Sequence, residues 1–212
     1  MNLILLGAPG AGKGTQAEML VKRLNIPSIS TGNMLREAMA NGSELGKQVK
    51  QAMDEGKLVS DELVLGITAQ RVAQPDCKNG YILDGVPRTL AQAEALEQMG
   101  VVIDYVVSIE IDDAVIEGRM TGRRVCPKCG ATYHIVANPT NVEGICDQCG
   151  AEVIIRKDDA PETVKSRLAT YHSTTEVLKD FYAQRGKLKL INGDQSIEGA
   201  FADILKAIGE KV

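Results

Sequence analysis

The chain has 212 residues, of which 44% are hydrophobic, 25% are charged and 3% are aromatic, and its formal net charge is -4 at pH 7. This length suits one domain with room for a small insert, and the composition excludes a disordered or membrane-embedded chain. The acidic balance and the absence of Trp argue against a nucleic-acid-binding protein, which needs basic charge and stacking aromatic rings.

The first apolar run, Asn2–Leu6, predicts a short buried strand. A Gly-rich turn follows, and then an amphipathic pattern that predicts a helix over Lys13–Leu24. The apolar run has no basic leader, and no long apolar segment comes after it. We therefore expect no secretion signal, no membrane span and a cytoplasmic location.

Strands and helices alternate along the rest of the chain. Strand-like runs lie at residues 81–83, 105–111 and 187–191, and helical periodicity is found at residues 91–98, 114–120 and 162–182. This alternation predicts an α/β fold with a parallel sheet covered on both faces.

Two segments interrupt the alternation. Residues 30–59 are helical in pattern and are interrupted by Gly42, Gly46 and Gly56, and they predict a small helical cap. Residues 122–159 are rich in Gly, Pro, Cys and β-branched residues, and they predict a β-rich lobe. No repeat or linker divides the chain, so we expect a single domain over residues 1–212 that carries two inserts.

The turn after the first strand, Gly-Ala-Pro-Gly-Ala-Gly-Lys-Gly-Thr at residues 7–15, has the composition of a phosphate-binding loop. Its glycines let backbone N–H groups surround a phosphate, the helix N-terminus adds partial positive charge, and Lys13 adds a full charge. The alternative is a plain turn between strand and helix.

Gly14 occupies the place where the general motif has a Mg²⁺-ligating hydroxyl. We therefore expect Mg²⁺ to be held mainly by phosphates and water, with Asp84 as its acidic partner or, alternatively, as an ordinary turn residue.

Arginines gather at the borders of both inserts. Phosphoryl transfer needs positive charge wherever oxygens gain negative charge in the transition state. The candidates are Arg36, Arg88, Arg119, Arg123, Arg124, Arg156 and Arg167.

Four of the five cysteines form two Cys-x-x-Cys pairs, Cys126 with Cys129 and Cys146 with Cys149, separated by sixteen residues. This spacing is typical of a four-thiolate zinc site. Four protein ligands leave no position for a substrate, so the metal would be structural. Two disulfides, an iron site or free thiols are the alternatives, and Cys77 is expected to be a buried or loop thiol.

Five motifs in this order resemble the signatures of bacterial adenylate kinases with a long lid, over essentially the whole chain. They are the phosphate loop, Ser-Thr-Gly-Asn-Met-Leu-Arg at 30–36, Asp-Gly-Val-Pro-Arg-Thr at 84–89, Gly-Arg-Arg at 122–124 and Arg-Lys-Asp-Asp at 156–159. The resemblance implies a three-layer P-loop fold with a five-stranded parallel sheet, an AMP-binding cap at 30–59 and a zinc-binding lid at 122–159. It also implies a monomer that transfers the terminal phosphoryl group of MgATP to AMP, giving two ADP, without nucleic-acid or membrane partners.

The resemblance further implies the roles of individual residues. The ATP site would comprise Gly10, Ala11, Gly12, Lys13, Gly14, Thr15, Arg119, Arg123, Thr132, Tyr133 and Gln195. The AMP site would comprise Thr31, Arg36, Lys57, Leu58, Val59, Gly85, Val86, Pro87, Arg88, Gln92, Arg156 and Arg167. The catalytic groups would be Lys13, Asp84, Arg88, Arg123, Arg156 and Arg167, and the metal ligands would be Cys126, Cys129, Cys146 and Cys149.

The chain departs from the family pattern at Asn33, where Asp is usual, and at Val86, where Phe is usual. The first change is expected to alter the affinity for Mg²⁺ or the pH dependence of that affinity. The second is expected to alter the discrimination of the acceptor base. An AMP phosphate is already mostly dianionic at pH 7, so no general base is needed, and His134 and His172 are interpreted as ordinary lid or surface residues.

Two other functions compete with this interpretation. One is a P-loop phosphotransferase with another acceptor, which the cysteine-bearing insert and the Arg-Lys-Asp-Asp motif argue against. The other is a nucleotide-switched binding protein whose zinc ribbon contacts nucleic acid or a partner. Residues 126–149 contain one Lys against one Glu and one Asp, which disfavours nucleic acid.

Overall fold

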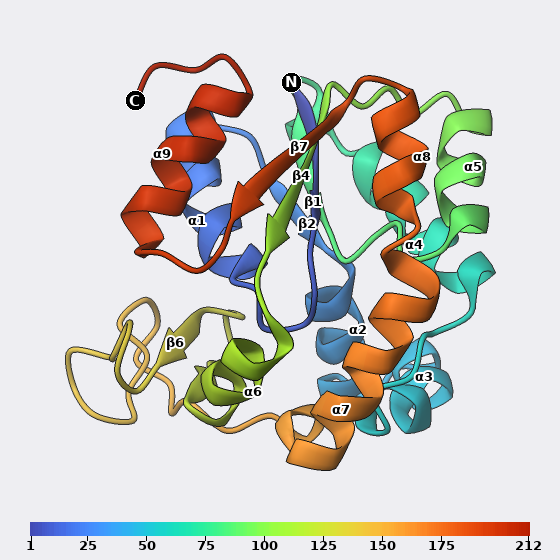
Figure 1. Cartoon of the computed structure of the whole chain (residues 1–212). Helices are drawn as coiled ribbons and strands as arrows, with labels where there is room; N and C mark the ends of the chain where they lie inside the picture. The colour runs from blue at the N-terminus through green and yellow to red at the C-terminus, as the bar shows by residue number, and fades with distance from the viewer.

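A computed structural model describes all residues, 1–212, and its centre is a five-stranded parallel sheet in the order β2-β3-β1-β4-β7. The strands are β1 (Asn2–Leu6), β2 (Ser28–Ser30), β3 (Tyr81–Asp84), β4 (Tyr105–Glu110) and β7 (Leu188–Asn192). All of them run towards the end of the molecule that carries both inserts (Figure 1). Ligand sites of open α/β sheets lie at the carboxyl ends of the strands, so this edge is where a site is expected.

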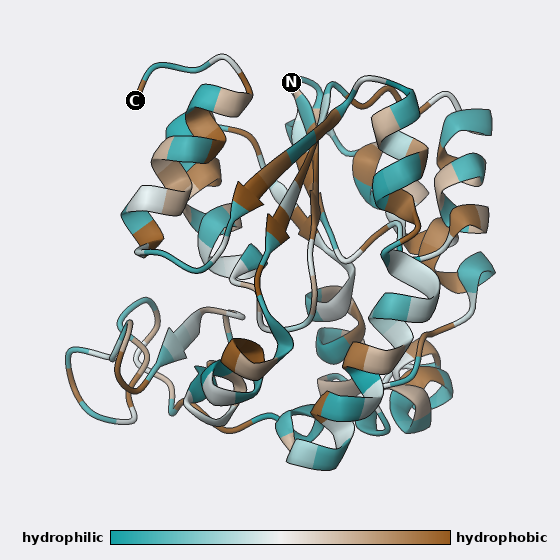
Figure 2. Ribbon diagram, in the orientation of Figure 1, coloured by the Kyte–Doolittle hydropathy of each residue, from teal (hydrophilic) through white to brown (hydrophobic).

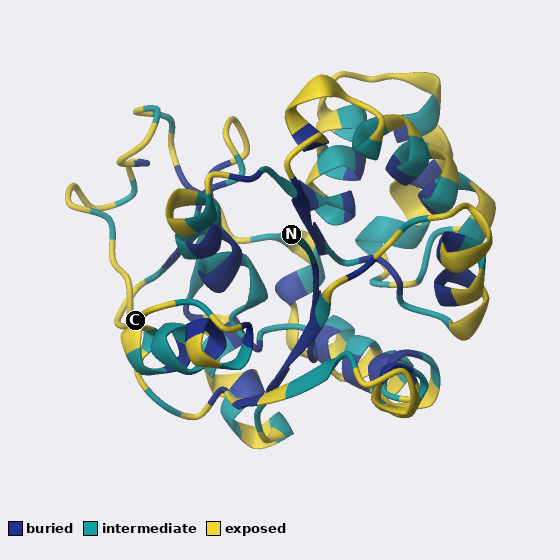
Figure 3. Cartoon of the chain, turned by 90° about the horizontal axis from the view of Figure 1, so that it is seen from above, coloured by how far each residue is buried: buried dark blue, intermediate teal, exposed yellow.

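Helices cover both faces of the sheet, as Figure 3 shows in a view from above. Helices α1 (Lys13–Leu24) and α9 (Ile197–Ala207) lie on one face, and α4 (Asp61–Val72), α5 (Leu90–Gln98) and α8 (Leu178–Gln184) lie on the other. Strand β1 is apolar on both sides, and its successive residues alternate between the two cores. Figure 2 shows the brown of hydrophobic residues along the strands, as expected for a parallel sheet buried on both faces.

The first insert is helical, as predicted. It consists of α2 (Thr31–Ala40) and α3 (Glu44–Asp54), which pack against each other. The packing is close at Gly46, where a Cβ atom would lie 2.1 Å from the carbonyl oxygen of Ala38. Ser43 caps α3 by accepting a hydrogen bond from the Gly46 N–H at 3.1 Å, which satisfies one free amide of the first turn.

The second insert is a small β-rich lobe, also as predicted. It lies between α6 (Asp113–Thr121) and α7 (Pro161–Thr170), and it contains the antiparallel strands β5 (Arg123–Val125) and β6 (Thr132–His134). Isolated bridges, such as Val125 with Ile154, extend this pairing. The lobe has its own core of five buried residues: Cys126, Ala131, Tyr133, Cys146 and Val153.

Most predicted elements are confirmed. The strand Asn2–Leu6 and the helix Lys13–Leu24 have the predicted bounds, and the three later strands agree to within one residue at each end. The helix predicted over 162–182 is instead α7, a π-helical turn at Tyr171–Thr175, and α8. The turn buries Tyr171 and Thr175, and the Thr175 hydroxyl donates to the Arg88 carbonyl oxygen at 2.8 Å. No helix has both the length and the apolar character needed to cross a membrane.

Candidate active site

The turn between β1 and α1 lies at the strand ends and is built to receive an anion. Gly12 precedes α1 with a φ of 97°, in the left-handed region that favours glycine. No side chain caps this helix and no acidic residue lies in its first turn, so its N-terminal amides are left for a ligand. Gly7 lies so close to β4 that a Cβ atom would be 2.6 Å from the Ile109 carbonyl oxygen.

Lys13 lies inside this loop. Its Nζ donates to the carbonyl oxygens of Gly7 at 2.7 Å and Ala8 at 2.8 Å. Burial lowers the pKa of Lys13 to about 8, in spite of the attraction of Asp84 and with the help of repulsion by Arg88. The ammonium group is therefore short of compensating negative charge, which a phosphate would supply.

The loop opens into a cavity of about 500 Å³ bounded by the core, the first insert and the second insert. Seven cationic side chains line it, against the carboxylates Asp84 and Glu198. The cations are Lys13, Arg36, Arg88, Arg119, Arg123, Arg156 and Arg167. Such an excess of positive charge is unfavourable unless anions enter, so the cavity suits polyanionic ligands.

Two aspartates at the end of the second insert organise three of these arginines. Asp158 pairs with Arg156 and lies 3.0 Å from Nη1 of Arg167, while Asp159 pairs with Arg123. Burial raises the pKa of Asp158, but its hydrogen bond from Arg156 and the surrounding arginine charges outweigh burial and hold the pKa at about 2. The sequence prediction gave these aspartates no role, although they directly follow Arg156 and Lys157.

Arg36 and Arg88 form the end of the cavity that borders the first insert. Nε of Arg88 donates to the Gly85 carbonyl oxygen at 3.0 Å, and Arg36 donates to Oδ1 of Asn33. Burial lowers the pKa of both guanidinium groups, and Arg156 lowers them further by repulsion. Leu58, Gly85 and Pro87 also line this end.

Five residues predicted for the AMP site lie outside the lining of the cavity: Thr31, Lys57, Val59, Val86 and Gln92. Gln92 is buried, and its side-chain amide accepts from the Arg88 N–H and donates to Asp61, both at 2.7 Å. The Thr31 hydroxyl donates to the Gly85 carbonyl oxygen at 3.0 Å. Both residues thus shape the wall behind the cavity, whereas Lys57 is exposed and pairs with Glu55.

All the residues predicted for the ATP site line the cavity. Nη2 of Arg119 donates to the Gly193 carbonyl oxygen at 3.0 Å, which ties the stem of the second insert to the loop after β7. The Tyr133 hydroxyl lies 3.3 Å from Sγ of Cys146 and accepts from the Asp147 N–H at 2.9 Å. This hydroxyl is therefore engaged with a cysteine of the second insert and not with the cavity.

His134 lines the cavity, which the sequence prediction missed. Its Nδ1 accepts hydrogen bonds from the N–H groups of Val136 and Ala137, both at 3.1 Å, so the proton of the neutral ring lies on Nε2. Nε2 is buried close to Gly122 at the end of α6, and burial lowers the pKa of the ring although a hydrogen bond with the Arg119 backbone partly offsets this. His134 therefore borders the cavity while its N–H faces the backbone at the end of α6. No spacing in the sequence indicated this.

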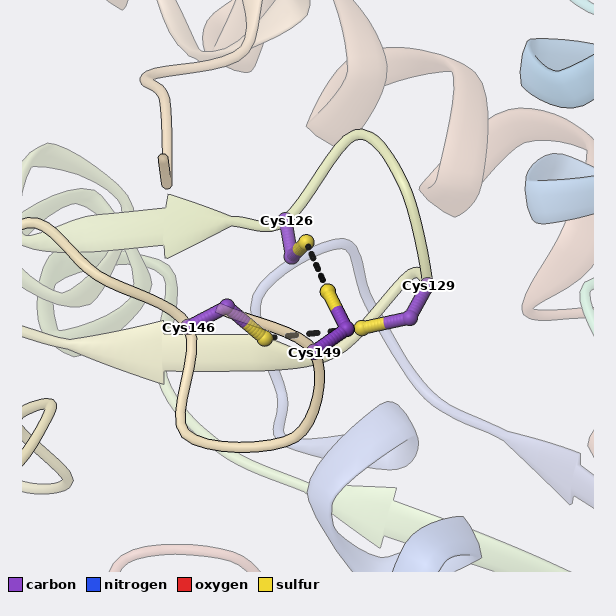
Figure 4. Close-up of side chains that lie close together, drawn as sticks. All are labelled: Cys126, Cys129, Cys146 and Cys149. Carbon is purple, nitrogen blue, oxygen red and sulfur yellow. Dashed lines mark hydrogen bonds between the residues drawn. The ribbon is translucent and has the colours of Figure 1, made fainter. Parts of the chain in front are cut away.

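The four cysteines of the second insert come together in one cluster, shown in Figure 4. Their Sγ atoms all lie within 4.8 Å of one another, with Cys126 to Cys149 at 3.4 Å and Cys129 to Cys146 at 3.5 Å. A tetrahedral zinc with Zn–S bonds of about 2.3 Å requires S···S separations of about 3.8 Å, so the donor set fits a structural metal. The thiols are unbridged, which removes the two-disulfide alternative, and Cys77 is buried elsewhere.

Comparisons with known proteins agree with this geometry. The family model described as Adenylate kinase matches residues 5–187. An adenylate kinase of Caldicellulosiruptor bescii is 53% identical, with 99% of each chain covered. Adenylate kinases of Lachnospira eligens and of a Geobacillus species are each 51% identical over 213 residues, with 99% of this chain covered. The chain therefore belongs to the adenylate kinase family.

Proposed function

We propose that this protein reversibly transfers the terminal phosphoryl group of MgATP to AMP, giving two ADP. The observation that carries the proposal is the single cavity in which a phosphate loop meets seven cations from the core and both inserts. A cavity of this kind suits two phosphate-bearing ligands placed end to end. Curated relatives that share about half of their residues with this chain carry the name adenylate kinase.

ATP is assigned to the phosphate-loop end of the cavity. The backbone of Gly10, Ala11, Gly12, Gly14 and Thr15 and the ammonium of Lys13 would hold its phosphates. Arg119, Thr132, Tyr133 and Gln195 would surround the rest of the nucleotide, as all four line the cavity. We add His134 to this set, since it also lines the cavity.

AMP is assigned to the end formed by the first insert. Arg36 and Arg88 would bind its phosphate, and Leu58, Gly85 and Pro87 line the adjoining wall. Gln92 and Thr31 would act by holding the backbone of Arg88 and Gly85, to which they are hydrogen bonded. Val86 is buried behind this wall, and the roles of Lys57 and Val59 rest on the family resemblance alone.

The chemistry needs orientation and charge but no general base. Arg123, Arg156 and Arg167 would surround the transferring group, and Asp158 and Asp159 hold these guanidinium groups in place.

Adenylate kinases use Mg²⁺ with ATP. Asp84 suits the neighbourhood of a hydrated Mg²⁺, because it lines the cavity and no hydrogen bond or ion pair occupies its carboxylate. Bound there, the metal would neutralise phosphate charge.

The two inserts are assigned as moving covers, with residues 30–59 as the AMP cap and residues 122–159 as the lid. Enclosure keeps water away from the phosphoryl group. We assign zinc to the four cysteines, since a closed thiolate site of this size suits it. A reducing cytoplasm suits unbridged thiols, and a monomer is the family expectation.

The test is a coupled assay of ADP formation from MgATP with AMP, CMP, GMP or UMP as the acceptor. We expect turnover largely confined to AMP. Turnover with another acceptor would retain phosphoryl transfer but overturn the assignment of AMP. Phosphate release without any acceptor dependence would overturn the proposed reaction and favour a nucleotide-switched protein.

The affinity for MgATP is expected to fall as the pH rises above about 8. Burial lowers the pKa of Lys13 to about 8, whereas the triphosphate binds the charged ammonium. Binding below that pH takes up no proton at Lys13, and binding above it takes up one. The association constant should therefore fall by up to about tenfold per pH unit between about pH 8 and pH 10.

Titration calorimetry in two buffers of different ionisation enthalpy measures this proton uptake directly. The Lys13→Arg variant is the control, because its guanidinium keeps its proton over this pH range. Its association constant for MgATP should therefore not change with pH, whatever its absolute value. A wild-type association constant that stays flat from about pH 7 to about pH 9.5 would contradict the prediction.

A further inference from the structure

The loop between β7 and α9, with Gly193, Gln195 and Ser196, and the first residue of α9, Ile197, form one wall of the ATP end of the cavity. Hydrogen bonds from two distant elements hold this wall. Arg119 of α6 donates to the Gly193 carbonyl oxygen, and Nε2 of Gln16 donates to the Ile197 carbonyl oxygen at 2.9 Å. The wall is thus tied at its two ends to different parts of the protein.

Gln16 directly follows the phosphate loop and lies in the first turn of α1. Gln16 is only 3% exposed and borders the cavity, and its partner Ile197 lies 181 positions away in the chain. Only the amide nitrogen of Gln16 can face a carbonyl oxygen as a donor, so the orientation of the amide is determined. Its Oε1 consequently remains buried without any partner.

An unpartnered buried oxygen costs free energy, and an apolar side chain of the same length would avoid that cost. The amide at this position is therefore explained by the hydrogen bond that its nitrogen makes. Apart from its backbone, Gln16 has one polar link, and that link joins the helix that begins at the phosphate loop to the wall of the cavity.

We propose that Gln16 is a positioning residue that sets the register between the phosphate loop and this wall at the ATP end of the cavity. The inference rests on the proposed function, since it takes ATP to be the donor. One nucleotide must reach both features at once, so a shift of the wall relative to α1 weakens ATP binding. AMP does not meet this wall, so its binding is unaffected.

The test compares Gln16→Met with the wild-type enzyme. Gln16→Met keeps the length of the side chain and removes the donor. We expect the KM for ATP to rise about fivefold, the size of one lost hydrogen bond, with kcat and the KM for AMP within about twofold. Gln16→Glu places a carboxylate against the Ile197 carbonyl oxygen, and it should raise the KM for ATP further.

The matched control is Thr68→Val, which removes another buried hydrogen bond. The Thr68 hydroxyl donates to the Val64 carbonyl oxygen at 2.7 Å within α4 and does not line the cavity. This variant should lose stability while both KM values stay unchanged. A Gln16→Met enzyme that behaves in the same way would overturn the proposal.

Amide hydrogen exchange of residues 193–199 in the nucleotide-free protein gives a second readout. Exchange should be faster in Gln16→Met than in the wild type, and equal exchange would overturn the proposal. This result does not depend on turnover, so it separates failure of the positioning role from failure of the proposed reaction. Should Gln16→Met not fold, Gln16→Asn, with a shorter amide, is measured in the same two ways.

Discussion

Replacement of Arg123 with Met is expected to lower kcat by at least about 10³-fold, a loss of about 4 kcal/mol of transition-state stabilisation. Arg123 lies at the start of the lid, lines the cavity and is held by Asp159. Its charge faces the place where the phosphoryl group would be transferred. Steady-state kinetics with MgATP and AMP measure the effect.

Arg124 provides the matched control. It is the next residue of the same strand, but its guanidinium donates to the carbonyl oxygens of Thr121 and Arg123 and does not line the cavity. Arg124→Met should therefore leave kcat within about twofold, because surface charges of this kind contribute little. Equal losses in the two variants would contradict the assignment of Arg123.

Arg123→Met also removes the principal partner of Asp159, whose side chain is 1% exposed. An unpaired buried carboxylate costs about 3 to 5 kcal/mol of stability, so part of any loss of activity could come from unfolding. The double variant Arg123→Met/Asp159→Asn removes that charge. It should recover thermal stability without recovering kcat, which separates the two effects.

Loss of the zinc proposed for the four cysteines is expected to lower the melting temperature by about 10 °C. A structural zinc contributes roughly 10 kcal/mol or more to the folding of small zinc-finger peptides. The loss of about a third of that free energy lowers the Tm of a chain of this size by about 10 °C. The lid has a core of only five residues, two of them cysteines of the cluster, so little else holds it together. Cys129→Ala tests this with the least loss of packing, since Cys129 is the exposed ligand.

Zinc quantitation, thermal unfolding and amide exchange over residues 122–159 measure the outcome in Cys129→Ala. Exchange should rise in the lid and stay low in the sheet. Cys77→Ala is the control, because Cys77 is buried outside the cluster and its loss should leave about one metal per chain. A Cys129→Ala protein with unchanged lid exchange and Tm would contradict a structural role for the metal.

Local patterns predicted the parts of the fold that depend on local interactions. The strand, glycine turn and helix that begin the chain follow one another directly. Each of them shows either a clear hydrophobic pattern or the residues typical of a turn. By contrast, β2 has three residues and exists through its pairing with β3, in which Ile29 lies beside Leu83. Helix α4 carries apolar residues on several faces, so its periodicity is weak.

The sites that were missed depend on contacts between distant segments. Asp159 meets Arg123 across 36 positions, and Gln16 meets Ile197 across 181. The break in the helix at Tyr171 comes from a π-helical turn whose Thr175 reaches the Arg88 carbonyl oxygen. The motif at residues 84–89 predicted a role for Arg88 but not the contacts that hold it in place. Family resemblance suggested site residues, most of which line the cavity, and the structure adds residues that hold some of them in place.

The most direct test of the account is ³¹P NMR of the enzyme with MgADP as the sole nucleotide. Direct transfer between two bound nucleotides predicts that ATP and AMP appear in equal amounts until equilibrium, without release of inorganic phosphate. Formation of inorganic phosphate in place of ATP, or an unchanged ADP spectrum with active-site residues intact, would contradict phosphoryl transfer in this cavity.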